Sequence, residues 1–169
     1  MRAALGKLDE HITSPAHLVV GGGAAMVLAY GYNLATQDVD VFAARGGLRV
    51  ADLHAAAQAV ADELHIQHDW LNSHFETFTH VLPPDYASRL EPIFQGKWLR
   101  VDALGAEDLL VMKCFAGRDK DRPHARKLVR RVKDLSVIER RIAELIERRI
   151  PGAEKAADTF DDLRDEAGL

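Results

Sequence analysis

Two aspartates, Asp38 and Asp40, alternate with apolar residues in the segment Asp38-Val39-Asp40-Val41-Phe42. A strand turns successive side chains to opposite faces, so this alternation places both carboxylates on one face. Two neighbouring carboxylates repel each other, and a cation bound between them removes the repulsion. Carboxylate oxygens suit Mg²⁺, which typically takes one or two of them and completes its shell with water and substrate phosphates. The pair therefore predicts a magnesium-dependent phosphate site.

Three consecutive glycines, Gly21, Gly22 and Gly23, follow the short apolar run 18–20 and precede a helix-like segment over 24–30. Glycine lets the backbone approach a ligand because no Cβ intervenes, and the free N–H groups at a helix start favour anions. The order of strand, glycine turn and helix therefore predicts that a triphosphate reaches backbone N–H groups at Gly22 and Gly23.

This order of glycines, helix and Asp-x-Asp strand resembles the nucleotidyltransferase superfamily of DNA polymerase β. Within the superfamily, GGGAAMVLAYG followed by Thr-x-Asp-Val-Asp-Val is most similar to the small bacterial toxin-type (AbiEii-like) nucleotidyltransferases of toxin–antitoxin pairs. A second block agrees with the resembling families, in which a lysine in an apolar helix is followed by Ala-x-Arg and a Lys-Asp pair. The matching residues are Lys113, Ala116, Arg118, Lys120 and Asp121. The resemblance covers roughly residues 17–128.

The resemblance implies roles for individual residues. Asp38 and Asp40 are expected to bind Mg²⁺ or Mn²⁺, and Thr36 to contribute to nucleotide binding. Lys113 is expected to neutralise triphosphate charge, and Asp121 to orient the lysine or a bound group. The superfamily usually has a third metal-binding carboxylate on a later strand, for which Asp102 is the best match. An aspartate on an isolated strand equally fits a sheet edge in water, so this alternative stays open.

Two positions depart from the family pattern. Leu34 stands where the family often has an arginine, and His124 stands where many relatives have a further acid. An alternative function is therefore a catalytically degenerate protein that binds a nucleotide or a partner protein. A second alternative is a dinucleotide-binding oxidoreductase, because a glycine cluster follows a strand. Against it, Met26 occupies the sixth position of the G-x-G-x-x-G pattern, which requires Gly or Ala.

The hydrophobic pattern predicts an α+β fold, in which a small mixed sheet carries the three aspartates and helices flank it. Helices are expected over 3–12, 50–64 and 105–116, strands over 77–82 and 98–104, and a turn at Gly46-Gly47. Residues 1–116 are expected to form the nucleotidyltransferase core. Residues 117–169 are expected to form a helical C-terminal region packed on that core as a single compact unit.

Within the C-terminal region, helices are expected over 124–132 and from Ser136, where Ser136 and Glu139 have the spacing of a capping box. The acidic tail 159–169 either adds a short helix or frays. Residues 117–149 hold twelve Lys and Arg against six Asp and Glu, although the whole chain carries a net charge of −4. A basic segment suits a polyanionic acceptor such as tRNA. A solvated helix face rich in i,i+4 ion pairs explains the same charges.

Several other classes of protein are disfavoured. The single cysteine, Cys114, lies in an apolar run and is expected to be a small buried residue rather than a nucleophile. The eight histidines have no zinc-binding spacing. No apolar run approaches the ~20 residues of a membrane span, and the first residues lack the apolar core of a signal peptide. A cytoplasmic protein is therefore expected.

The sequence thus predicts a magnesium-dependent nucleotidyltransferase that transfers a nucleoside monophosphate (NMP) from a nucleoside triphosphate (NTP) to an acceptor hydroxyl and releases pyrophosphate. In toxins similar to this chain the acceptor is tRNA or a protein. The same resemblance implies an antitoxin protein as a partner.

Overall fold

The computed structural model describes residues 1–36, 38–44 and 47–169, except for the side chain of Lys120. The predicted turn at Gly46-Gly47 therefore lies partly outside the described residues. The chain forms two compact units, of which the first comprises residues 1–77 and 89–104 and the second residues 78–88 and 105–169. The expected boundary after residue 116 lies instead at the end of a helix within the second unit. Packing of the two parts as one body stays a prediction.

The first unit is built on a five-stranded mixed sheet of order β3-β2-β1-β5-β4. Its strands are β1 (Ala16–Val20), β2 (Val39–Ala43), β3 (Leu71–Asn72), β4 (Glu91–Gln95) and β5 (Leu99–Ala103). β1 pairs antiparallel with β2 and parallel with β5, while β2–β3 is parallel and β4–β5 antiparallel. The predicted α+β fold is confirmed. The antiparallel β1–β2 pair also rules out, at this glycine turn, the parallel βαβ unit of a dinucleotide-binding oxidoreductase.

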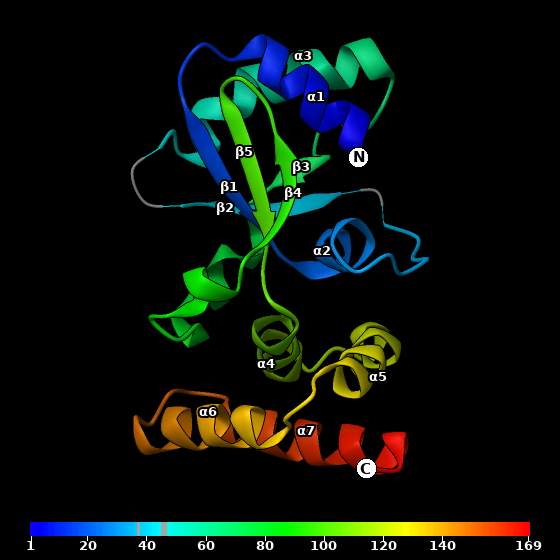
Figure 1. Cartoon of the computed structure of the whole chain (residues 1–169), viewed down its shortest axis with the longest axis vertical. Helices are drawn as coiled ribbons and strands as arrows, with labels where there is room; N and C mark the ends of the chain where they lie inside the picture. The colour runs from blue at the N-terminus through cyan, green and yellow to red at the C-terminus, as the bar shows by residue number, and fades with distance from the viewer. Residues whose placement is uncertain (37, 45–46) are drawn as a thin grey trace. The chain divides into compact units, whose positions relative to one another are not determined.

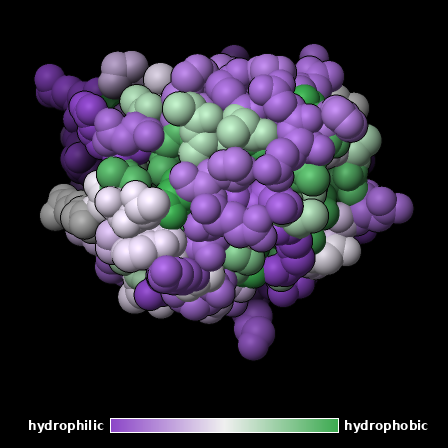
Figure 2. Space-filling model, turned by 90° about the horizontal axis from the view of Figure 1, so that it is seen from above, coloured by the Kyte–Doolittle hydropathy of each residue, from purple (hydrophilic) through white to green (hydrophobic). Residues whose placement is uncertain are grey.

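Three α-helices accompany the sheet in the first unit: α1 (Arg2–His11), α2 (Gly22–Leu28) and α3 (His54–Leu64), the last preceded by the 3₁₀ helix η1 (Val50–Leu53). α1 packs against α3 and β5 (Figure 1) and buries Leu5 and Leu8, which its helical period places on one side. The outward sides of α1 and α3 carry ion pairs such as Lys7–Glu10, at 2.9 Å. Figure 2, turned by 90° from Figure 1, shows a mainly hydrophilic face with small apolar patches.

The segment between β3 and β5 differs most from prediction. The expected strand at 77–82 is wrong, because residues 74–81 form the 3₁₀ helix η2 (His74–Val81), which η3 (Tyr86–Arg89) follows. Aromatic and β-branched residues favour strands, but packing overrides that preference here. The edge strand β4 was not expected. It contains a proline and buries only Ile93, so its sequence lacks the alternation of a half-buried strand.

The second unit contains four α-helices: α4 (Ala106–Ala116), α5 (Arg122–Arg131), α6 (Ser136–Glu147) and α7 (Ala153–Ala167), with the 3₁₀ turn η4 (Asp119–Asp121) before α5. α4 packs against the other three helices, and every residue from Asp108 to Cys114 is buried. The acidic tail forms the fifteen-residue helix α7 instead of fraying. No helix in the described part of the chain is long and apolar enough to cross a membrane.

Ion pairs between helices use part of the basic charge of the second unit. Arg122 and Arg126 of α5 both pair with Glu166 of α7, the latter pair at 3.5 Å. These partners lie on different helices, so the pairing is not the i,i+4 pattern considered above. The predicted capping box is also wrong. Asp134 Oδ1 accepts the backbone N–H of Ser136 at 3.0 Å and its hydroxyl at 2.6 Å, so an aspartate before the helix caps α6.

Candidate active site

The glycine turn between β1 and α2 places each glycine against a different neighbour. A Cβ on Gly21 would lie 2.6 Å from the ring of Phe75, one on Gly22 would lie 3.2 Å from Asp40 Oδ2, and one on Gly23 would lie 3.3 Å from Thr36 Oγ1. Gly22 also has a φ of +59°, which side chains rarely adopt. Glycine is therefore needed here both for backbone conformation and for close approach to two predicted site residues.

The two aspartates lie at the start of β2. The backbone N–H of Gly21 donates to the carbonyl of Asp40 at 3.0 Å, which ties the strand to the glycine turn. The Asp40 side chain is half-buried and that of Asp38 is exposed. The hydroxyl of Thr36 lies 3.1 Å from Asp38 Oδ1 and 3.3 Å from the Asp38 carbonyl. The structure therefore brings together five predicted site residues: Gly22, Gly23, Thr36, Asp38 and Asp40.

The chemistry of this cluster fits the predicted magnesium ion. Asp38 meets a neutral hydroxyl, which orients the carboxylate without cancelling its charge. Asp40 lies in the space that a side chain on Gly22 would fill. Among residues 1–36, 38–44 and 47–169, no group of three or more His, Cys, Asp or Glu side chains is arranged to hold a metal. Two carboxylates, water and substrate oxygens form the shell that magnesium commonly takes.

Asp102 lies on β5 on the same face of the sheet as Asp40. Val19 of β1 is in register with both Asp102 and Phe42, and Phe42 is two residues beyond Asp40 on β2. Asp102 is only 1% exposed, so the alternative of a sheet-edge residue in water is wrong.

The carboxylate of Asp102 has partners within the protein. His17 Nε2 lies 2.7 Å from Asp102 Oδ2, and Arg100 Nε donates to the same oxygen at 2.8 Å. The guanidinium of Arg100 offsets the charge of this carboxylate without a metal. A role for Asp102 as third metal ligand stays a prediction. Arg100 lies two residues before Asp102 on β5, so strand periodicity places both on one face, whereas only the register of β1 with β5 brings His17 to Asp102, and His17 was not predicted.

The second unit holds the other predicted pair. Lys113 is 7% exposed on α4, and its Nζ donates to Asp121 Oδ1 at 2.8 Å. Arg118 Nε donates to the other carboxylate oxygen at 2.6 Å. Gly117, with a φ of +54°, ends α4 and lets η4 bring Asp121 back to the lysine. Lys113 therefore meets an anion inside the unit and does not extend to water.

The charges around Asp121 set its protonation. Burial alone would raise the pKa of Asp121, but the hydrogen bonds and positive charges of Lys113 and Arg118 outweigh burial and lower the pKa below its usual value. Burial and the charge of Lys113 lower the pKa of His124, and Asp121 offsets this only in part. The imidazole is therefore neutral at pH 7. At the position where the resemblance led us to expect an acid, this chain thus has an uncharged ring.

Cys114 has the structural role that was expected of it, and Trp70 is a second buried residue that stabilises the fold. Cys114 is fully buried, and burial raises the pKa of its thiol to about 12, so it is unreactive at neutral pH. Trp70 is 2% exposed, and its indole N–H donates to the carbonyl of Ala57 at 3.0 Å. Phe75, which covers Gly21 and meets Phe42 edge-on at 5.5 Å, had no signal in the sequence.

The fold and this cluster define a class of protein. A mixed sheet that presents an Asp-x-Asp strand against a glycine turn is the arrangement predicted for nucleotidyltransferases. The model of the family described as nucleotidyltransferase of unknown function (DUF6036) matches residues 2–161, and the chain belongs to this family. No curated protein and no solved structure gave a match. The nucleotidyltransferase prediction is thereby confirmed at the level of the family.

Proposed function

We propose that the protein is a magnesium-dependent nucleotidyltransferase, which transfers NMP from an NTP to an acceptor hydroxyl and releases pyrophosphate. The observation that carries the proposal is the approach of Asp40 to Gly22 and of Thr36 to Gly23, with Asp38 bound to the Thr36 hydroxyl. Carboxylates for a cation and bare backbone for phosphates thus lie in one cluster. Membership of a nucleotidyltransferase family supports the same reaction class.

Each residue of the cluster has a task in this proposal. Asp38 and Asp40 would hold Mg²⁺ or Mn²⁺. When bound, the metal supplies positive charge that polarises the α-phosphate and stabilises the leaving pyrophosphate. Gly22 and Gly23 leave their backbone accessible to phosphate oxygens because no Cβ intervenes. Thr36 fixes the orientation of Asp38.

Lys113 and Asp121 enter the proposal through the resemblance. We assign Lys113 a role in binding triphosphate charge, and Asp121 a positioning role, because its carboxylate fixes the lysine Nζ at 2.8 Å. The pair also stabilises the second unit, since both residues are buried there. A test of their role in the reaction must therefore separate loss of binding from loss of folding.

For the acceptor we propose RNA, with tRNA as the first molecule to test and protein as the second. The basic residues of α5 favour RNA, although two of them, Arg122 and Arg126, already form ion pairs with Glu166 of α7. The toxin-type resemblance extends the proposal to a toxin role with an antitoxin partner.

The test is a transfer assay with α-³²P-labelled NTPs, supplied one at a time with Mg²⁺ and total tRNA or a protein extract. We expect label on the acceptor with the wild-type protein and none above background with Asp38→Asn/Asp40→Asn. Binding of NTP without transfer to any acceptor would favour the degenerate alternative. In that case Leu34→Arg/His124→Asp, which restores the family residues, should create transfer.

A further inference from the structure

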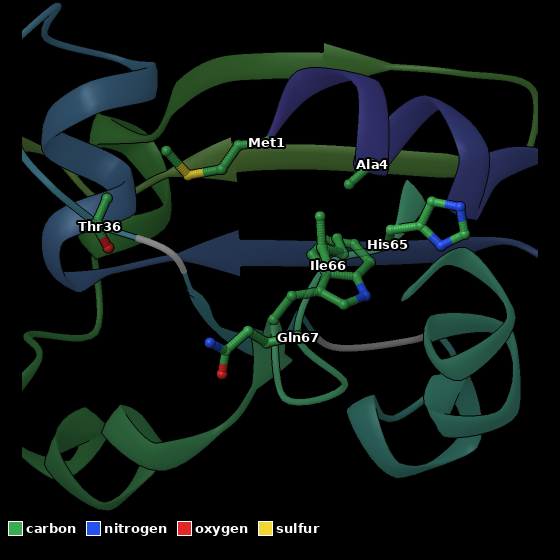
Figure 3. Close-up of a pocket in the computed structure, with 7 residues that line it drawn as sticks. Met1, Ala4, Thr36, His65, Ile66 and Gln67 are labelled. Carbon is green, nitrogen blue, oxygen red and sulfur yellow. The ribbon is translucent and has the colours of Figure 1, made fainter. Parts of the chain in front are cut away.

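A cavity of about 620 Å³ opens in the first unit next to the candidate site. Figure 3 shows Met1 at the start of α1, Thr36 before β2, and Ile66 and Gln67 after α3 bordering open space. Trp70 and His65 complete most of the remaining wall. The volume lies in the range of roughly 300–1,000 Å³ that is typical of small-molecule sites.

The lining combines apolar surface with a few polar groups. Trp70 lines the cavity but is only 2% exposed, and its indole N–H donates to the Ala57 carbonyl, so it closes the wall behind the exposed Ile66. Ile66 is 38% exposed, and only two other large hydrophobic side chains in the described part of the chain are exposed, namely Ile146 and Leu169. Gln67 adds an amide, which has both a hydrogen-bond donor and an acceptor. A flat apolar molecule with a polar edge matches this lining.

The residue that ends α3 at the rim of the cavity has an unusual backbone conformation for its type. His65 ends α3 with a φ of +52°, and the backbone N–H groups of both His65 and Ile66 point to the carbonyl of Ala61. Glycine is the usual residue at such a left-handed helix end. His65, which lines the cavity, thus has a backbone conformation that side chains disfavour, and such backbone outliers cluster at ligand sites.

Thr36 connects the cavity to the phosphate end of the candidate site. It lines the cavity, its hydroxyl lies 3.1 Å from Asp38 Oδ1, and it lies against Gly23. A ligand with its phosphates at the glycine turn and its ring in the cavity would therefore pass Thr36 between these two ends.

We propose that this cavity binds a nucleobase with its ribose, belonging to the NTP or to a nucleoside at the end of the acceptor. The inference rests on the proposed function, since it supplies the base site for that reaction. Ile66, the exposed apolar residue of the lining, would contact the face of the base, and the Gln67 amide would pair with its edge, as glutamine does with adenine in other complexes.

The experiment is calorimetric titration of the full chain with ATP, GTP, CTP, UTP and inorganic tripolyphosphate, all with Mg²⁺. Tripolyphosphate has the phosphates without the base. We expect at least one NTP to bind about tenfold more tightly than tripolyphosphate, which is about 1.4 kcal/mol and within reach of one hydrogen bond together with the burial of Ile66. Ile66→Ser and Gln67→Ala should remove most of that difference and leave tripolyphosphate binding unchanged.

A matched control is Ile146→Ser on α6, since Ile146 is 37% exposed and lies outside the cavity. It should bind every ligand as the wild type does. Titration with free nucleosides in the presence of saturating NTP distinguishes the two sources of the base. Competition assigns the cavity to the NTP, and binding without competition assigns it to the acceptor.

The two proposals fail in different ways. If tripolyphosphate and NTPs bind with Mg²⁺ but neither NTP nor nucleoside affinity responds to Ile66→Ser and Gln67→Ala, the cavity proposal is wrong and the proposed function stands. If no phosphate ligand binds, the proposed function fails. Nucleoside binding that Gln67→Ala weakens would then still support the cavity as a base site.

Discussion

The two units of the molecule treat their carboxylates differently. In the second unit, the buried Asp108 and Asp121 meet cations of the same unit, Arg141 at 3.0 Å and Lys113 at 2.8 Å. In the first unit, Asp38 is exposed beside a neutral hydroxyl, and Asp40 approaches the bare backbone of Gly22. A carboxylate with a protein cation stabilises the fold by itself. Asp38, which is exposed beside a hydroxyl, suits a cation from outside.

Asp102 shows that this difference concerns the site and not the whole first unit. It lies on the same sheet as Asp40, yet Arg100 and His17 share its Oδ2. Like Asp108 and Asp121 in the second unit, Asp102 is therefore paired with a cation of its own unit. The comparison predicts large stability effects where a protein cation is removed, and small stability effects with loss of binding at the Asp38–Asp40 pair.

The largest effect is expected for Lys113→Met. Removal of the lysine leaves Asp121 buried with the half-exposed Arg118 beside it, and loss of one member of a buried pair typically costs about 3–5 kcal/mol of unfolding free energy. Urea denaturation measures the change. The double variant Lys113→Met/Asp121→Leu, which removes both charges, should recover much of the loss. A loss below about 1 kcal/mol in the single variant would contradict a structural role for the pair.

An intermediate effect is expected for Asp9, whose carboxylate accepts the backbone N–H groups of Lys97, Trp98 and Leu99 at 2.7–2.9 Å. Asp9→Ala should cost about 1.5–3 kcal/mol, the usual range for hydrogen bonds to a charged group. The test is again urea denaturation. Gly96→Ala should have a similar effect, because its Cβ would lie 2.3 Å from Asp9 Cγ. A neutral outcome for both variants would contradict this account of the β4–β5 turn.

The same carboxylate predicts a pH dependence. Burial raises the pKa of Asp9, but the three N–H groups outweigh it, so the pKa is lowered in the folded protein, as it is for Asp121. A lowered folded pKa means that the stabilisation is present above the unfolded pKa of about 3.9 and is lost as pH falls through the folded value. Melting temperature should therefore decline from about pH 5 downward. Asp9→Asn should decline less steeply, and an unchanged slope would count against the assignment.

A smaller difference in stability is expected between alanine variants of two glycines that have similar backbone angles. Gly22 and Gly31 have φ values of +59° and +69°, but only a Cβ on Gly22 would meet another group within 4 Å, namely Asp40 Oδ2 at 3.2 Å. Gly31→Ala should cost about 1 kcal/mol for the left-handed backbone alone. Gly22→Ala should cost more than that and also weaken magnesium-dependent NTP binding. Equal effects on binding would show that the approach to Asp40 is unimportant.

The sequence predicted the features that depend on neighbouring residues. The Asp38–Asp40 alternation, the glycine turn and the helix after Gly105 are all local patterns, and each appears in the structure. The apolar neighbours of Lys113 indicated only that its ammonium needs an anion or a path to water, and the structure shows that Asp121 is that anion. Contacts that depend on strand register or on packing between distant segments were not predictable. They include Phe75 over Gly21 and the His17–Asp102 pair, whose members are 85 residues apart.

The charged residues of the second unit also show that contacts between distant segments cannot be predicted from the sequence. Composition indicated a basic segment and an acidic tail, but it did not show that Arg122 and Glu166 would pair across two helices, since helix packing decides the partner. The strand expected at 77–82 failed for a related reason. Its residue types favour a strand, while the structure folds them into 3₁₀ turns that bring Phe75 onto the glycine turn.

The central claim is that the Asp38–Asp40 pair binds a metal–nucleotide complex and contributes little to stability. Calorimetric titration with each NTP, with and without Mg²⁺, tests it on the wild type and on Asp38→Asn/Asp40→Asn, with circular dichroism to verify folding. We predict binding that requires Mg²⁺ in the wild type and is absent in the folded variant. Equal binding by both proteins, or no binding by the wild type with Mg²⁺, would contradict the claim.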